Sequence, residues 1–229
     1  MSQKLQSSRS ALTELLGNTG VGAQGIEVSR GTVVYAQEST AEHVYLIHHG
    51  QIRLYQVGPD GQERLVEILG PGQWFGTAAL ANQPNASQAV AATQAQLSKI
   101  STTKLMEAVA AAPTASAELI RDLAAQLQSA RQEAARLVFQ DCNQRLIAAM
   151  IRFSESAAAT QQGDNVVLHL THEQLAQAVG AARETISLAL TEMRHRNVVR
   201  TGRNRLIFNR DALRQLSSES RNGHAQTAA

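Results

Sequence analysis

The chain has 229 residues, a formal net charge of +2, 43% hydrophobic residues and only 3% aromatic residues. This length suits two modest domains, whose cores must be built from Leu, Ile, Val and Ala. The single cysteine, Cys142, excludes an intramolecular disulfide framework, a zinc site of cysteines and an iron–sulfur cluster held by several cysteines. No apolar run is long enough to span a bilayer and the polar N-terminus does not resemble a signal peptide, so a cytoplasmic protein without a membrane partner is expected.

Residues 1–112 predict a β-rich domain behind a short helix at about 11–16 and a Gly-rich passage. From Ile26 onward, short apolar or β-branched runs alternate with turns, and Gly50, Gly61 and Gly72 recur every eleven residues. This spacing is typical of short strands and turns in an all-β sandwich or barrel. The expected strands are 32–35, 44–47, 51–57, 64–69, 86–92 and 96–100. They predict an antiparallel, jelly-roll-like β domain over 26–100, followed by a short helix at 102–111.

A long helix is expected from Pro113 to about Phe139, within a segment 113–140. Its apolar residues follow steps of three and four, which is the pattern of a coiled-coil seam: Ile120, Leu123, Leu127, Ala130, Ala134 and Leu137. Ala130 and Ala134 would let two helix backbones approach closely. The alternative is that this helix packs on its own β domain. We favour a homodimer through 113–139, because the seam is longer than one small domain can cover.

The C-terminal part, 141–217, predicts a helix-turn-helix. Asp141 and Cys142 interrupt the long helix, a further helix spans 143–154, 155–164 read as a polar loop, and 166–170 form a strand. Thr171 and Gln174 then form a capping box, and Gly180 ends that helix in the left-handed conformation. A second helix begins near Ala182, with Ile186, Leu190 and Met193 facing inward at helical spacing.

The first turn of this second helix presents polar side chains without an apolar partner, namely Arg183, Glu184, Thr185 and Ser187. A helix-turn-helix places such residues against base edges in the major groove. Next, 198–200 and 205–208 flank a Gly-containing turn at 201–204, which predicts a β-hairpin wing with Arg203 at its tip, able to meet phosphate. A last short helix is expected at 211–216 and a disordered tail at 218–229.

Positive charge is concentrated in this part of the chain. Between Arg183 and Arg214 there are eight arginines, no lysine and only three carboxylates. Localised positive charge is expected of a phosphate-contacting surface. The alternative is an ordinary solvated basic face.

The order of β domain, long helix and winged helix-turn-helix resembles the CRP/FNR (catabolite activator and fumarate–nitrate regulator) family of bacterial transcription factors. The resemblance covers about 26–210 and rests on VYLIHHGQIRLY (44–55), GPGQWFG (70–76), VFQDCNQRL (138–146) and LTHEQLAQAVGAARETIS (170–187). It implies an α+β chain with an N-terminal sensor domain like the cyclic-nucleotide-binding domain, a dimerisation helix and a DNA-binding winged helix. The implied partners are double-stranded DNA with an inverted-repeat operator, a second copy of the chain, and RNA polymerase.

The resemblance also assigns roles to single residues. Arg183 matches the arginine that reads guanine O6 and N7, and Glu184 matches the glutamate that accepts a hydrogen bond from cytosine N4. Thr171 and Thr185 match hydroxyls that contact the DNA backbone. The chain departs from the family at Leu188, where a second base-reading arginine is common, so the family's usual sequence preference in the inner half-site does not carry over to this chain.

The implied effector pocket departs further, over Gly76, Thr77 and Ala78. Thr77 stands where cyclic-AMP-binding members have the glutamate that holds the ribose, and no arginine or lysine occurs between Arg64 and Lys99. A buried phosphate without a cationic partner is heavily penalised. On the long helix, Ala130 and Arg131 replace the polar pair offered to adenine; Arg131 either meets another anionic effector or is simply solvated. These residues argue against cyclic AMP, with an atypical cyclic-nucleotide pocket as the alternative.

Other chemistry is not supported. His48 and His49 are adjacent on an expected strand and point to opposite faces, so they cannot ligate one haem iron together. Nothing near Cys142 in sequence is arranged to lower its pKa, so a passive cysteine is expected. We find no nucleophile–base pair, metal-ligand spacing or phosphate-binding glycine loop, and therefore expect neither an enzyme nor a bound cofactor or metal. The rival from another class is a ligand-binding module whose winged helix mediates protein contacts.

Overall fold

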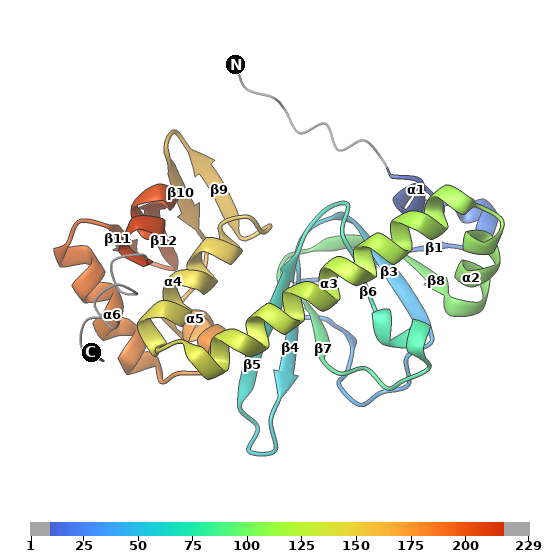
Figure 1. The fold of residues 1–229 in the computed structure, drawn as a ribbon. Helices are drawn as coiled ribbons and strands as arrows, with labels where there is room; N and C mark the ends of the chain where they lie inside the picture. Colours follow the sequence, from blue (N-terminus) through green and yellow to red (C-terminus); the bar gives the residue numbers. More distant parts are fainter. Residues whose placement is uncertain (1–9, 218–229) are drawn as a thin grey trace. The chain divides into compact units, whose positions relative to one another are not determined.

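The computed structural model describes residues 10–217, so the disordered tail expected at 218–229 lies outside the described residues. The chain divides into two compact units, one formed by Met1–Val57 with Leu69–Gln132 and the other by Gly58–Ile68 with Glu133–Ala229. Figure 1 labels the elements of both units, and the long helix α3 (Pro113–Phe139) contributes residues to each of them.

The β-rich part confirms the jelly-roll prediction. Two four-stranded antiparallel sheets are formed, in the orders β1-β8-β3-β6 and β2-β7-β4-β5, although most of β5 lies in the segment Gly58–Ile68 that is grouped with the second unit. The strands are β1 (Gln24–Val28), β2 (Val33–Tyr35), β3 (His43–His49), β4 (Ile52–Val57), β5 (Glu63–Leu69), β6 (Trp74–Phe75), β7 (Gln88–Ala91) and β8 (Ala95–Ser101). β1 was not expected, because it begins in the Gly-rich passage; it exists because its backbone pairs with β8, with Ile26 opposite Leu97. β6 is too short to be seen in the sequence.

The interior of this unit is apolar, and one turn next to it requires glycine. Ile47 and Ile52 are fully buried, and Tyr45 stacks on Phe75 with ring centroids 5.0 Å apart. Gly50 joins β3 to β4 with φ of +87°, and a Cβ there would lie 2.3 Å from the carbonyl oxygen of Gln94. Any side chain at Gly50 would therefore clash with the backbone as well as strain it.

Short helices cover one end of this unit, and the first half of α3 is fixed to it. The helical pieces are α1 (Ala11–Gly17), η1 (Thr19–Val21), η2 (Thr77–Ala81) and α2 (Thr102–Ala110). Glu118 of α3 accepts a hydrogen bond from the backbone N–H of Leu12 (2.8 Å), which lowers the pKa of that carboxyl. Asp122 accepts one from the indole N–H of Trp74 (3.0 Å). Leu123 packs against the same core, so this member of the expected seam is shared with its own unit.

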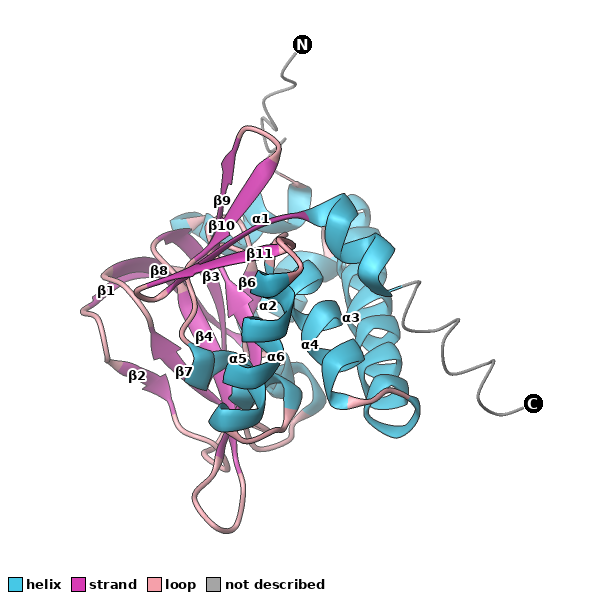
Figure 2. Cartoon of the chain, turned by 90° about the vertical axis from the view of Figure 1, so that its left-hand side faces the viewer, coloured by secondary structure: helices cyan, strands magenta, loops and turns pink. Residues whose placement is uncertain are grey.

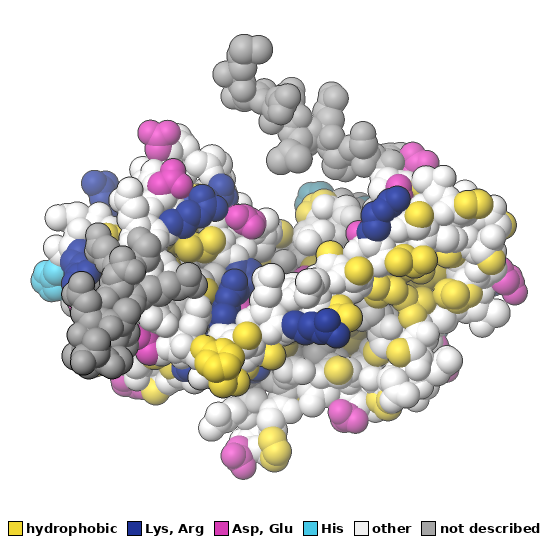
Figure 3. Space-filling model, viewed as in Figure 1, with side chains coloured by type: hydrophobic (Ala, Val, Ile, Leu, Met, Phe, Trp, Pro, Cys, Tyr) yellow, Lys and Arg dark blue, Asp and Glu magenta, His cyan; other side chains and the backbone are white. Residues whose placement is uncertain are grey.

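Beyond these contacts, α3 leaves apolar side chains uncovered. Ile120 is 67% exposed and Leu127 is 52% exposed. In Figure 3, apolar side chains lie over and beside this helix in the unit that holds its first half. The last turns, which belong to the second unit, expose Leu137, Val138 and Phe139.

The second unit places helices on a small antiparallel sheet. It contains α4 (Cys142–Phe153), α5 (His172–Val179), α6 (Arg183–His195) and a further helix over 210–217, with β9 (Ala159–Gln162), β10 (Asn165–Leu168), β11 (Val199–Gly202) and β12 (Arg205–Asn209) in the order β11-β12-β10-β9. Asp141 caps α4 by accepting from the backbone N–H of Gln144 (2.8 Å), so Cys142 opens this helix instead of interrupting the previous one.

The prediction of a polar loop over 155–164 was wrong, because four of these residues form the strand β9. The strand lies at the edge of the sheet, and three of its four side chains are exposed. Its pairing with β10 uses only backbone groups, with Gln162 opposite Asn165. The polar side chains therefore carried no strand signal. Among the residues described, no helix is both long and apolar enough to cross a membrane.

Candidate nucleic-acid interface

The helix α5 is fixed at both ends by local hydrogen bonds. The hydroxyl oxygen of Thr171 accepts from the backbone N–H of Gln174 (3.1 Å), while the side-chain oxygen of Gln174 accepts from the backbone N–H of Thr171 (3.1 Å). Gly180 follows the helix with φ of +66°. Arg145 of α4 donates to the carbonyl oxygen of Val179 (3.1 Å), one of the groups that a helix end leaves without a partner. The capping box and the glycine terminus expected from the sequence are confirmed.

The capping box gives a direct test of this geometry. Thr171→Ala should destabilise the second unit by about 1 kcal/mol, because the backbone N–H of Gln174 loses its acceptor. Urea unfolding followed by circular dichroism measures this loss, and Thr171→Ser, which keeps the hydroxyl, is the matched control. An unchanged midpoint for the alanine variant would mean that the cap contributes nothing.

The second helix, α6, divides into a buried side and an exposed side. Ile186, Leu190 and Met193 are buried, as expected, together with Ala189. Arg183, Glu184 and Thr185 are exposed in the first turn. Ala182 at the N-cap makes no side-chain cap hydrogen bond, which leaves the first backbone N–H groups of α6 without that partner. The structure thus presents a helix N-terminus with Arg183 beside it, a combination suited to an anionic ligand.

Ser187 is tied to α5 by a contact that sequence reasoning missed. The imidazole Nδ1 of His172 lies 3.0 Å from the hydroxyl oxygen of Ser187. Burial, and secondarily the nearby Arg183, lower the pKa of His172. The hydroxyl of Thr191 donates to the backbone carbonyl of Ser187 (2.9 Å). Ser187 therefore helps to hold α6 against α5, and no periodicity in the sequence signals a bond between two separate helices.

The wing is tighter than the sequence suggested. β11 and β12 pair from Val199 opposite Phe208 to Gly202 opposite Arg205, so the turn contains only Arg203 and Asn204. The four-residue turn expected at 201–204 was too long, because Thr201 and Gly202 already belong to the ladder. Asn204 adopts φ of +56°, a conformation that asparagine tolerates.

The start of α5, the start of α6 and the wing turn all line one groove. This groove has a volume of about 420 Å³. Its lining residues are Leu170, Thr171, His172 and Glu173 around the start of α5, Arg183 at the start of α6, and Gly202 and Asn204 at the wing turn. Figure 2 looks toward the side of the chain that carries α5 and α6. Of the residues expected to contact DNA, Thr171 and Arg183 thus line one groove, Arg203 lies in the turn beside it, and Glu184 and Thr185 follow Arg183 on α6.

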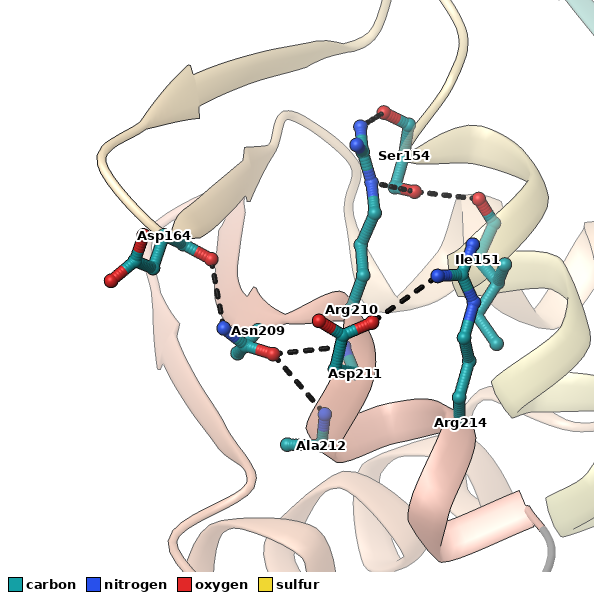
Figure 4. A network of polar contacts seen from close by, with 8 residues as sticks. All are labelled: Ile151, Ser154, Asp164, Asn209, Arg210, Asp211, Ala212 and Arg214. Atoms are coloured by element: carbon teal, nitrogen blue, oxygen red, sulfur yellow. Dashed lines mark hydrogen bonds and ion pairs between the residues drawn. The ribbon is translucent and has the colours of Figure 1, made fainter.

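The eight arginines of this region do not have one common role. Arg210 donates to the hydroxyl and the carbonyl oxygen of Ser154 and so fastens the last helix to α4, as Figure 4 shows. Arg214 pairs with Asp211 (3.2 Å), and Arg196 lies 3.8 Å from Glu192. The other five are exposed and have no carboxylate within 4.0 Å among residues 10–217: Arg183, Arg194, Arg200, Arg203 and Arg205. These five are available to phosphates.

The residues expected around an effector lie in the first unit. Gly76 has φ of +92°, and a Cβ there would approach the carbonyl oxygen of His43 to 2.6 Å, so this glycine is required by the backbone. Thr77 and Ala78 are half-buried at the start of η2. Ala130 and Arg131 are exposed on α3, and Arg131 makes no hydrogen bond or ion pair within the described part of the chain. That part also contains no cluster of three metal-ligating side chains.

Both parts of the chain are similar to known protein families. Residues 26–112 match the family described as a cyclic nucleotide-binding domain, and residues 144–216 match the family described as a Crp-like helix-turn-helix domain. The chain is 31% identical over 193 residues to the CRP-like cAMP-activated global transcriptional regulator of Mycobacterium tuberculosis, covering 83% of this chain and 86% of that protein.

Solved structures give the same result. A CRP/FNR-family transcriptional regulator from Thermus thermophilus superposes with a TM-score of 0.69 at 26% identity, covering 85% of this chain and 98% of that one. A CooA mutant from Carboxydothermus hydrogenoformans reaches a TM-score of 0.74 at 18% identity, covering 90% of this chain and 95% of that one, which shows a shared fold alone. The predicted arrangement of β domain, long helix and winged helix-turn-helix is confirmed.

Proposed function

Because the chain belongs to the CRP/FNR family of DNA-binding transcription regulators, we propose that two copies act together on an inverted-repeat operator. Members of this family are regulators and not enzymes. We assign 1–112 to a sensor domain, 113–140 to a dimerisation helix and 141–217 to a DNA-binding domain. The protein then works in the cytoplasm, with RNA polymerase as its further partner.

The single observation that carries the DNA assignment is the groove at the starts of α5 and α6. The wing turn borders the same groove, and exposed arginines that have no carboxylate within 4.0 Å among residues 10–217 lie on α6 and on the wing. In this assignment, Arg183 reads a guanine and Glu184 accepts from a cytosine. Thr171, Thr185 and Arg203 contact the backbone, which fixes the register of the protein on the duplex. Ser187, tied to His172, holds the recognition helix in place beside these residues.

The exposed apolar stripe of α3 supports the dimer. Ile120, Leu127 and Val138 are each more than half exposed, and the small residues Ala130 and Ala134 between them are exposed as well. Such a stripe on a long helix is the seam that a second helix covers in a parallel coiled coil. Two recognition helices held in this way meet half-sites about one turn of DNA apart.

Two measurements test the proposed function together. Selection of bound duplexes from a random pool should return an inverted repeat, and binding to unrelated duplex should weaken steeply as salt is raised. A surface that contacts several phosphates releases counterions on binding, which causes this salt dependence. If the winged helix instead mediates protein contacts, no duplex will be enriched and salt will have little effect.

We further propose that the effector, if the chain requires one, is not cyclic AMP. Thr77 offers a half-buried hydroxyl in place of a carboxylate. The stretch 65–98 supplies no arginine or lysine for a cyclic phosphate. The relative from Mycobacterium tuberculosis is named as cAMP-activated, but that name describes the relative, and the residues of this chain favour a different or absent effector.

Cyclic AMP at 0.1 mM should therefore leave the thermal melting of the full-length protein unchanged. A ligand present at one hundred times its dissociation constant stabilises by about 2.7 kcal/mol, which melting detects easily. Addition of a selected operator duplex is the positive control for the assay. A clear stabilisation by micromolar cyclic AMP would overturn this proposal.

A further inference from the structure

We propose that Leu188 reads the 5-methyl group of a thymine in each operator half-site, one or two base pairs from the pair that Glu184 contacts. The inference rests on the proposed function and adds a specificity-determining residue to it. Leu188 is 74% exposed, although burial of a leucine side chain is strongly favourable.

The position of Leu188 on α6 places it among the base readers. The buried side of the helix is formed by Ile186, Leu190 and Met193, so the opposite side faces away from the protein. Leu188 lies on that opposite side, four residues after Glu184. Four residues of α-helix advance about 6 Å, and successive base pairs are about 3.4 Å apart. A residue one turn beyond Glu184 thus reaches a neighbouring pair within the same half-site.

The surroundings of Leu188 argue against a second role in packing. Its neighbours on the helix surface, three and four residues away in either direction, are Glu184, Thr185, Thr191 and Glu192, and all of them are polar. The other large exposed apolar residues that the structure describes in this unit, Leu137, Val138 and Phe139, lie on α3. Leu188 is therefore a single apolar side chain in a polar surface, too small to dock another protein by itself.

The chemistry of the major groove selects one occupant. A leucine side chain can neither donate nor accept a hydrogen bond, so it cannot read the N7, O6 or N4 groups of the other bases. The 5-methyl group of thymine is the one methyl group that an unmodified base pair presents there, and it protrudes further than the C5–H of cytosine. Contact between this methyl group and the Leu188 methyl groups removes both from water without leaving a polar group unpaired.

The experiment replaces thymine by uracil, which removes only the methyl group. Each thymine of the selected operator is exchanged in turn, on both half-sites at once, and duplex affinity is measured for the natural chain and for Leu188→Ala. One exchange should weaken binding by the natural chain by about ten-fold, as expected for a methyl group lost from each half-site. The same exchange should leave the affinity of Leu188→Ala unchanged.

Arg183→Ala is the matched control, because it should lose affinity while remaining sensitive to the same uracil exchange. Leu188→Ala should also melt at the natural temperature, since the side chain is exposed. If the natural chain tolerates uracil at every position, or if Leu188→Ala loses as much affinity as the natural chain, the thymine contact is refuted while DNA binding stands. If no duplex is bound in the first place, the proposed function fails, and this inference fails with it.

Discussion

Arg183→Ala should lower the affinity for the selected operator by roughly 1–3 kcal/mol per half-site, the usual loss for a good bidentate contact to guanine. Over two half-sites this is the largest effect expected of a single substitution at the DNA surface. Arg183 is exposed and its guanidinium has no carboxylate partner within 4.0 Å in the described part of the chain. The expected loss therefore comes from the DNA contact and not from the fold, and titration of a labelled duplex at fixed salt measures it.

Three other arginine variants separate base reading from simple charge. Arg183→Lys keeps the charge but loses the planar fork, so it should lose most of the preference for guanine. Arg203→Ala should weaken binding to all duplexes to a similar degree, because phosphate contacts carry no sequence information. It should also reduce the slope of log affinity against log salt concentration by about 1, because one phosphate contact is lost. Arg214→Ala, whose guanidinium pairs with Asp211, removes the same charge away from the groove and should change little. If Arg183→Ala binds the operator as tightly as the natural chain does, α6 is not the helix that reads the bases.

The helix-turn-helix could be predicted from the sequence because its signals are local. A capping box, a left-handed glycine and three apolar residues at helical spacing each lie within a few residues of one another. The structure confirms all of them. The turn after β3 was predictable for a similar reason, since only glycine fits at Gly50.

The elements that were missed depend on partners far away in the chain. β9 carries no apolar alternation, and β1 has only the short alternation Ile26-Glu27-Val28 after Gly25; both strands are formed by backbone pairing, with β8 and β10 as partners. The bond between His172 and Ser187 joins two helices, and whether Leu123 faces its own core or a second helix depends on how α3 lies on the sheet. None of this is encoded in the spacing of residues, so the sequence predicted the local elements of the helix-turn-helix better than the contacts that hold these elements together.

The apolar seam of α3 shows the same difference between sequence and structure for the residues that could join two copies of the chain. The sequence pattern gave six apolar positions, and the structure leaves five of them exposed while Leu123 packs inward. A single small domain cannot bury both sides of the helix. The remaining positions form an exposed apolar stripe with Ile120 67% and Leu127 52% exposed, and exposed apolar patches often mark sites of protein–protein contact.

A carboxylate placed in this stripe should abolish the dimer. Ile120→Asp and Leu127→Asp each put a charge where two identical helices would meet, so two like charges would be desolvated together. Because both side chains are more than half exposed in one chain, the fold of each unit should persist. Sedimentation at micromolar concentration should show a dimer for the natural chain and a monomer for either variant.

Operator binding should fall with the dimer, because a monomer engages one half-site and loses the high effective concentration of the second reader. The affinity should drop by about 100-fold or more, while binding to an isolated half-site stays as it was. Ala125→Asp, which adds the same charge two residues from Leu127 and therefore on the opposite side of the helix, is the control that should remain dimeric. If the Leu127 variant still sediments as a dimer and binds the full operator normally, the two copies must join through another surface, and α3 would have to be covered by something else.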